Sequence, residues 1–495
     1  MSIRTHIMKT KTNYLLALFL LSLACTSCNK FLDVTPDQRA DLEKNENIGE
    51  LLATAYPQAN YIPFTEAISD NAGDKGSGTV SQVNSAPFLF QDVADIYSDS
   101  PTYYWNAAYK AIAAANHALQ AIEKQGKGAT LNAFKGEALV ARAYAHFMLV
   151  KLFAWGDDPK ENAGKPGIPY VTSVEDVVVK KYERGTVGQV YEAIEKDLLA
   201  GLPLLDDRIY KSPKYHFTTN AAHAFASRFY LFKKNYAKVI EHSNLVLGSG
   251  DPKSLLRQVN SATYRSLQYY ELEAQYTRAE NAANILLVEA PSIWGRSYPR
   301  YRYSFDYPTF QSLFGSNVSG GSWGYNIYGN DVTLNIPKFR EHFVRQDLHA
   351  ETGIPYNMIP LFTMEEVLFN RAEANSMLGN FDAALVDLNH YVATRMVVSQ
   401  QNPVFSAALL LSRNKLLNFY ETSDLQYALV QCVLDLKRFN FMHEGMRWFD
   451  IIRHKLKVVH RTTDGKVLTL GPNDPMRIFQ IPQEAQSSGI ELNPR

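Results

Sequence analysis

Apolar residues recur at intervals of three and four along several stretches of the chain, and this spacing predicts helices. One helix is predicted to begin at Tyr104. One face of it carries Trp105, Ala108, Tyr109, Ile112, Asn116 and Leu119. A second helix is predicted over residues 136–155, where several alanines would let a neighbouring helix approach closely. A third is predicted over residues 186–205, because Thr186 can cap its first turn.

Two further stretches, residues 218–250 and 364–395, each predict a pair of helices joined by a turn. Both match the tetratricopeptide unit, a repeat of ~34 residues. The later pair has the large, small and turn residues that the repeat requires at Leu368, Ala372, Gly379, Phe381, Ala384 and Leu388. The earlier pair fits at Ser227, Tyr230, Tyr236 and Val239, with Lys234 in place of the turn glycine. Because the pairs are scattered along the chain, we expect repeat-like pairs within a helical domain and not a long solenoid.

Two regions depart from this helical pattern. Residues 59–102 are rich in Gly, Ser and Asp and predict a long surface loop. Residues 251–360 lose helical periodicity and are crowded with aromatic residues, which predicts an irregular region with a few short strands. The predicted fold is therefore mostly α, with a loop-rich region between two helical parts.

Helices are also predicted near both ends of the chain. Residues 37–58 are amphipathic with helical spacing up to Pro57. Toward the C-terminus, helices are predicted over residues 403–417 and 423–456, and the second of these should break near Gly445. The remaining tail is rich in Pro and Gly and predicts a coil.

The N-terminus has the features of an export signal. A basic segment precedes an apolar run from Leu15 to Leu23, which is shorter than the ~20 residues of a membrane span. Small residues then lead to Cys25 and Cys28. A signal that ends immediately before a cysteine marks a bacterial lipoprotein, and we predict that Cys28 is the acylated residue. Cys25 is the alternative site, and an ordinary cleaved signal with incidental cysteines is a further alternative.

The composition of the chain excludes one class of function and limits how the protein can be stabilised. Lys plus Arg and Asp plus Glu both number 50, so the chain lacks the positive charge of a nucleic-acid-binding protein. The chain has three cysteines, and only Cys432 lies clear of the signal region. With Cys28 acylated, no disulfide is expected, and a packed core must stabilise the exported domain.

Catalytic and metal-binding patterns are absent from the sequence. His443–Glu444 lacks the second histidine of a zinc-protease helix, and no phosphate-binding loop or nucleophile motif occurs. The prediction is a protein that is not an enzyme and holds no cofactor and no metal.

Several motifs in order resemble those of the SusD/RagB family. They are CNKFLDVTPD after the signal, the W-x3-Y-x2-I-x3-N helix from Trp105, GEALVARAYAHF, LFNRAEANSMLGNFDAALVDLN, HEGMRWFDIIRH and the tail's IPQEAQSSGIELNP. The resemblance runs from Cys28 to Arg495. It implies a surface lipoprotein of the outer membrane, facing the cell exterior, that works with a SusC-like TonB-dependent transporter.

The resemblance also suggests how the chain is divided. The signal peptide would cover residues 1–27, and a helical part with repeat-like pairs residues 28–250. A variable, ligand-binding region would cover residues 251–360, and a C-terminal part with the family motif residues 361–495. We expect the motif residues to be a buried scaffold of ion pairs around a tryptophan. They are Glu137, Arg142, Glu444, Arg447, Trp448 and Asp450.

Ligand contacts are expected in the variable loops. Exposed aromatic rings stack on the apolar faces of sugars, and Asn, Asp and Arg bind the hydroxyl groups. The candidates from composition and position are Asp70, Asn71, Asp74, Trp294, Arg296, Tyr301, Tyr303, Trp323, Tyr325, Asn326 and Tyr328.

Three functions follow from these patterns. The first is capture of an oligosaccharide for the partner transporter. The second keeps this role but changes the cargo to oligopeptides, as the RagB-like branch implies. The third is a repeat scaffold that binds only a partner protein.

Overall fold

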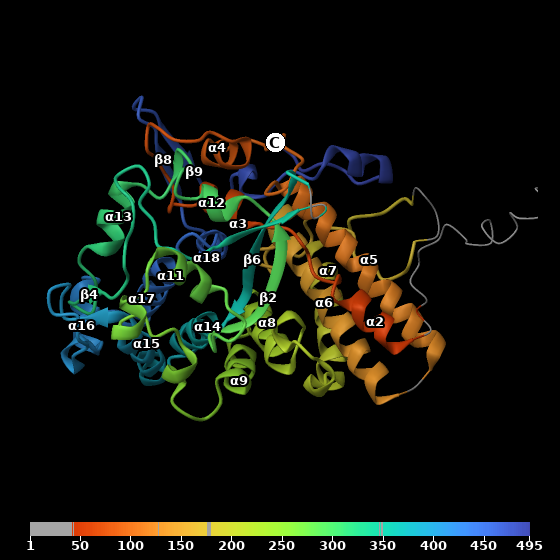
Figure 1. The fold of residues 1–495 in the computed structure, drawn as a ribbon, viewed down its shortest axis with the longest axis horizontal. Coiled ribbons are helices and arrows are strands. Elements are labelled where there is room, and N and C mark those ends of the chain that lie inside the picture. The colour runs from red at the N-terminus through yellow and green to blue at the C-terminus, as the bar shows by residue number, and fades with distance from the viewer. Residues whose placement is uncertain (1–41, 43, 127, 176–179, 346, 348–349) are drawn as a thin grey trace, which may run out of the picture. The chain divides into compact units, whose positions relative to one another are not determined.

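The computed structural model describes residues 42, 44–126, 128–175, 180–345, 347 and 350–495 (Figure 1). Residues Ile48–Arg495 form one compact unit. The signal segment and both candidate acylation sites, Cys25 and Cys28, lie outside the described residues. Among the helices that the structure describes, none combines the length and the apolar character of a membrane-crossing segment.

The fold is mostly helical, as the sequence predicts. The first helices are α2 (Asn45–Leu52), α3 (Ile62–Ile68), α4 (Gln82–Phe88), α5 (Pro101–Gln125), α6 (Ala129–Phe153) and α7 (Val187–Gly201). Helices α5 and α7 both pack against α6, which is buried throughout residues 136–153. The predicted cap of α7 is confirmed, because the Thr186 hydroxyl accepts a hydrogen bond from the Gln189 backbone at 3.2 Å.

The two repeat-like pairs lie next to each other in space. They are α8 (Thr219–Phe232) with α9 (Tyr236–Leu247), and α14 (Met364–Met377) with α15 (Phe381–Arg395). Helix α9 packs directly against α14, as Figure 1 shows. The pairs are scattered in the sequence but stack as neighbouring repeats do.

The turns of these pairs share one backbone conformation. Gly379 has a φ of +78°, and Lys234 has a φ of +54° at the equivalent place between α8 and α9. A lysine in this left-handed region costs about 1 kcal/mol relative to glycine. Its ammonium group pairs with Asp158 at 2.5 Å, which offsets part of that cost.

A three-stranded antiparallel sheet lies between the helical parts of the sequence. Its order is β2 (Asn284–Pro291), β6 (Gly353–Thr363) and β5 (Glu341–Arg345). Small two-stranded ladders join β1 (Gly73–Asp74) to β3 (Tyr303–Ser304), β4 (Ser322–Trp323) to β7 (Met396–Val397), and β8 (Val458–Arg461) to β9 (Val467–Leu470). Strands β2 and β6 are longer than the short strands that the sequence predicts. Strand β2 is buried on both faces, so its sequence lacks the alternation of apolar and polar residues that would have indicated its length.

The remaining described α-helices lie within residues 251–360 and in the C-terminal part. Residues 251–360 contain α10 (Ala262–Arg265), α11 (Tyr269–Tyr276), α12 (Trp294–Ser297) and α13 (Tyr307–Phe314). The C-terminal part contains α16 (Arg413–Phe419), α17 (Leu425–Asn440) and α18 (Met446–Arg453). The predicted break is confirmed, since Gly445 separates α17 from α18. The helix predicted over residues 403–417 is wrong in its start, because Ser412 caps α16.

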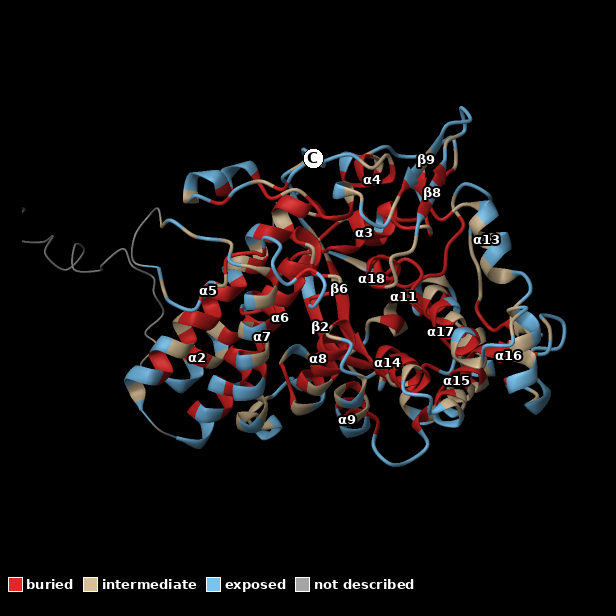
Figure 2. Cartoon of the chain, turned by 180° about the vertical axis from the view of Figure 1, so that it is seen from behind, coloured by how far each residue is buried: buried red, intermediate tan, exposed pale blue. Residues whose placement is uncertain are grey.

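The prediction of a surface loop over residues 59–102 is wrong. This segment contains α3, whose residues are all buried, and α4. Helix α3 packs against α18, far along the chain, so its burial depends on a contact that local periodicity does not encode. Figure 2 shows the buried residues gathered in α3, α6, α14, α18 and the sheet.

One buried carboxylate fixes the conformation of the turn between α17 and α18. Glu66 on α3 is 3% exposed and accepts hydrogen bonds from the backbone N–H groups of His443 at 3.0 Å and Gly445 at 2.8 Å. Gly445 has a φ of +68°, and a Cβ there would collide with Thr65. The turn therefore requires both the glycine and the carboxylate of α3.

Burial raises the pKa of Glu66 from 4.5 to about 7, despite its backbone donors. Between these two pH values the folded state keeps a proton that the unfolded chain has lost, so its stability falls as the pH rises. We expect this group alone to remove about 3 kcal/mol of unfolding free energy between pH 4.5 and 7. Urea unfolding at a series of pH values measures this loss.

The Glu66→Gln variant keeps one of the two acceptor oxygens and does not titrate, so its stability should be lower at acidic pH but should vary less across the same pH range. Subtracting the unfolding free energy of the variant from that of the native protein at each pH removes the contributions of the other buried acids. An identical pH dependence in both would refute the assignment.

Candidate functional site

A cavity of about 660 Å³ lies between α11, α12 and the segment 328–341. We refer to it as the α11–α12 cavity. Its lining falls within residues 251–360 and combines tyrosines with charged and amide groups. The lining includes Tyr269, Tyr270, Tyr328, Glu273, Arg296, Arg300, Asn335, Arg340 and Glu341.

Three tyrosines form the aromatic part of this wall. The ring of Tyr269 meets Tyr328 edge to face at 5.2 Å and Tyr270 at 5.4 Å. The Tyr269 hydroxyl donates to Asn335 Oδ1 at 3.3 Å, while Tyr270 is 72% exposed. An exposed ring beside hydrogen-bonding groups offers both contacts that a sugar ring requires.

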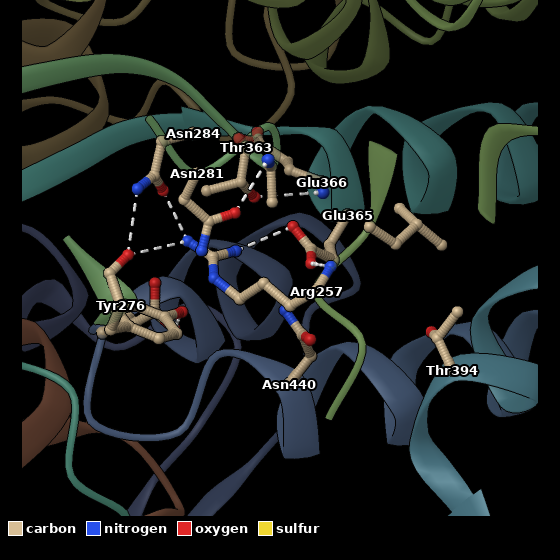
Figure 3. Close-up of polar contacts among 12 residues, drawn as sticks. Arg257, Tyr276, Asn281, Asn284, Thr363, Glu365, Glu366, Thr394 and Asn440 are labelled. Carbon is tan, nitrogen blue, oxygen red and sulfur yellow. Dashed lines mark hydrogen bonds and ion pairs between the residues drawn. The ribbon is translucent and has the colours of Figure 1, made fainter. Parts of the chain in front are cut away.

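The aromatic wall is held from behind by a buried polar network, shown in Figure 3. The carbonyl of Tyr276, at the end of α11, accepts from Asn284 at 2.9 Å and from Arg257 at 3.3 Å. Arg257 is also paired with Glu365 at 2.8 Å. Because these groups are buried and hydrogen-bonded to one another, they fix the position of α11 relative to β2 and α14.

The same helix is tied to the C-terminal family motif. The hydroxyl of Tyr276 donates to Glu444, and Lys338 donates to Glu444 at 2.6 Å and to the Asn440 carbonyl at 2.6 Å. Burial lowers the pKa of Lys338, although its Glu444 partner favours the charged form. The Glu444 carboxylate therefore joins three segments, which are α11, the residues that precede β5, and the turn between α17 and α18.

The opposite wall depends on α12. The Trp294 indole is buried and donates to the His443 carbonyl at 3.0 Å. Gly295 donates its backbone N–H to Asn357 Oδ1 at 2.9 Å, and Asn357 donates to the Arg340 carbonyl at 3.3 Å. A Cβ on Gly295 would lie 2.6 Å from Asn357, so only glycine allows this close approach.

The wall of the α11–α12 cavity contains more arginines than carboxylates. Arg296 pairs with Glu341 at 2.9 Å. In the described part of the chain, neither Arg300 nor Arg340 has an ion-pair partner. Burial raises the pKa of Glu273 to about 7, which the nearby Arg340 only partly opposes.

Of the predicted ligand residues, Arg296 and Tyr328 line the α11–α12 cavity. Asn326 lies close in sequence, but its amide donates to the Arg265 carbonyl at 2.9 Å and anchors the loop. Sequence reasoning missed Tyr269, Tyr270 and the other cavity residues. The signal that could have found them is the run Tyr269–Tyr276, which puts two adjacent aromatic residues in a short helix.

The expectation that the other aromatic candidates form an exposed platform has to be corrected. Trp294, Tyr301, Tyr303, Trp323 and Tyr325 are all buried. The Trp323 ring stacks on Phe439 with centroids 3.4 Å apart, and the Tyr325 hydroxyl accepts from Arg395 at 3.2 Å. These rings pack the region against the helices and offer no free face.

The polar candidates of the first loop are also engaged within the protein. Asp70 pairs with Arg447 at 2.8 Å, and Asp74 pairs with Arg302 at 2.7 Å. Burial would raise the pKa of Asp70, but the guanidinium groups of Arg438 and Arg447 lower it to about 2. Asn71 is fully buried and accepts from Arg438 at 2.8 Å. The expectation that these three bind ligand is corrected likewise, because their polar atoms are already used.

The motif residues lie in the core. Glu137 accepts from Tyr56 at 2.7 Å, and Arg142 makes a bidentate pair with Asp197 at 2.7 Å. Asp450 pairs with Lys437 at 2.6 Å. Trp448 is fully buried, and Glu444 and Arg447 make the contacts described above. All six are positioned to support the fold, and none lines the α11–α12 cavity.

A second hollow, of about 470 Å³, is lined by Tyr103, Lys110, Glu289 and Tyr356 among others. We refer to it as the Tyr103–Tyr356 hollow. It carries one cation and one carboxylate from these residues, so its charges balance. It therefore provides a comparison for the α11–α12 cavity.

Comparison with known proteins places the fold. A family model for SusD-like proteins, described as starch-binding and associating with the outer membrane, matches residues 30–231. A search of curated proteins finds no match. The α11–α12 cavity lies outside the matched residues.

Solved structures extend the likeness to most of the chain. A SusD-like carbohydrate binding protein from Bacteroides vulgatus has a TM-score of 0.61 and 18% identity, over 90% of this chain and 96% of its own. A SusD superfamily protein from Bacteroides thetaiotaomicron has a TM-score of 0.64 and 19% identity, over 91% of this chain and 100% of its own. A laminarin binding SusD-like protein has a TM-score of 0.59 and 17% identity, over 90% and 97%. The N-terminal part of the chain therefore matches the SusD-like family model, and the chain shares the SusD-like fold over most of its length.

Proposed function

We propose that this protein binds a saccharide nutrient in the α11–α12 cavity and delivers it to a SusC-like TonB-dependent transporter of the outer membrane. The observation that carries the proposal is the wall of three tyrosines beside charged and amide groups. The names of the similar proteins, which include carbohydrate and laminarin binding, support the ligand class. The transporter partner is inferred from the sequence resemblance.

The volume and the position of the cavity suit this role. A cavity of about 660 Å³ falls in the range of small-ligand sites, roughly 300–1,000 Å³. Its walls are short elements held by buried hydrogen bonds, so the site is formed before the ligand arrives. A preformed site loses less conformational entropy on binding.

Isothermal titration of the purified protein against a panel of oligosaccharides and peptide mixtures tests the ligand class. The Tyr270→Ala variant removes a largely exposed ring, so it should fold normally and bind the saccharide about fivefold more weakly. Tyr103→Ala, in the Tyr103–Tyr356 hollow, is the matched control and should bind as the native protein does.

Absence of binding to every saccharide, or binding of peptides alone, would contradict the proposal. Weaker binding in Tyr103→Ala with no change in Tyr270→Ala would move the site to the Tyr103–Tyr356 hollow.

The second part of the proposal is a lipid anchor at Cys28 that holds the domain at the outer membrane. Two or three acyl chains are enough for durable attachment without a membrane span. The family description, which mentions association with the outer membrane, supports this location.

Metabolic labelling with an alkyne analogue of palmitate tests the anchor in a bacterium that has an outer membrane. We expect the native protein and Cys25→Ala to be labelled and to sediment with membranes, and Cys28→Ala to be unlabelled. Loss of label only in Cys25→Ala would place the anchor there. Label in none of the three proteins would exclude it.

A further inference from the structure

The α11–α12 cavity carries more positive than negative charge. Arg296, Arg300 and Arg340 line it, and only Arg296 is balanced by a carboxylate partner, Glu341. The chain as a whole is neutral, with 50 basic and 50 acidic residues, so the excess is local. The Tyr103–Tyr356 hollow has no such excess.

The remaining acid of the wall compensates this charge only in part. Glu273 is 5% exposed, and its burial raises its pKa to about 7, which favours its neutral form. Arginine stays protonated throughout the accessible pH range. Arg300 and Arg340 are exposed and have no ion-pair partner among the described residues, and Glu273 opposes the charge of Arg340 only in part.

Their backbone positions are fixed. Asn357 is fully buried and bridges the Gly295 N–H and the Arg340 carbonyl, which joins both arginine-bearing segments. Arg300 follows α12 and donates its backbone N–H to the Ser297 carbonyl at 2.8 Å. Guanidinium groups on fixed segments are suited to bind planar or tetrahedral oxyanions through paired hydrogen bonds.

We propose that the saccharide bound in the α11–α12 cavity is acidic, carrying carboxylate or sulfate groups that meet Arg300 and Arg340. This inference rests on the proposed function, because it specifies the ligand of the same site. The tyrosines would contact the sugar ring, and the arginines would select its charge. A neutral glucan would leave both guanidinium groups without a partner.

Titration with three probes of similar length tests this selectivity: an oligogalacturonide, a sulfated galactan oligosaccharide and a neutral gluco-oligosaccharide. We expect one of the acidic probes to bind at least tenfold more tightly than the neutral one. The better of the two identifies carboxylate or sulfate as the recognised group. Raising the salt from 50 to 500 mM NaCl should weaken that binding, because exposed charges are screened.

The variants Arg300→Gln and Arg340→Gln should each weaken the acidic probe about tenfold, the usual size of a lost charge-assisted hydrogen bond. Arg413→Gln, on α16 and half exposed, is the matched control and should change nothing. The lysine variants Arg300→Lys and Arg340→Lys should recover part of the affinity, since they keep the charge without the paired donors.

The outcomes separate the two claims. If the neutral probe binds tightly and neither Arg300→Gln nor Arg340→Gln weakens it, the inference of an acidic ligand is wrong. The proposal of a saccharide site in the α11–α12 cavity would remain valid in that case. Failure of all three probes to bind would overturn this inference, and silence of the wider oligosaccharide panel would overturn the proposed function as well.

Discussion

The carboxylate of Glu444 is the contact on which the arrangement of this protein depends. It is buried and receives hydrogen bonds from Tyr276 on α11 and from Lys338 before β5. An unpaired charge in this position would cost several kcal/mol, so the three groups must assemble together. The neighbouring His443–Gly445 turn is held in the same way by Glu66 of α3. Three segments from distant parts of the sequence thus converge on one turn.

This convergence explains why a motif that does not line the α11–α12 cavity can matter for binding there. Trp294 donates to the carbonyl of His443, which places α12, and Tyr276 donates to Glu444, which places α11. These helices are the two walls of the α11–α12 cavity. The structure therefore separates a scaffold of buried charges from the proposed ligand surface of tyrosines and arginines.

The sequence predicts those features whose causes are local. The cap at Thr186, the break at Gly445 and the long helices follow from spacing and from residue conformations within one turn. Helix α3 could not be predicted, because it is short and buried on every side by distant segments. The choice between buried and exposed aromatic residues failed for the same reason. Trp294 donates to a partner 149 residues away and is buried, whereas Tyr270 meets the ring of its neighbour Tyr269 and stays exposed.

A crystal structure of the protein with its tightest-binding oligosaccharide tests the central claim most directly. The account predicts a sugar ring within ~4 Å of Tyr269, Tyr270 or Tyr328, between α11 and α12, with the Glu444 contacts unchanged. A ligand bound in the Tyr103–Tyr356 hollow, or elsewhere with the α11–α12 cavity empty, would contradict it.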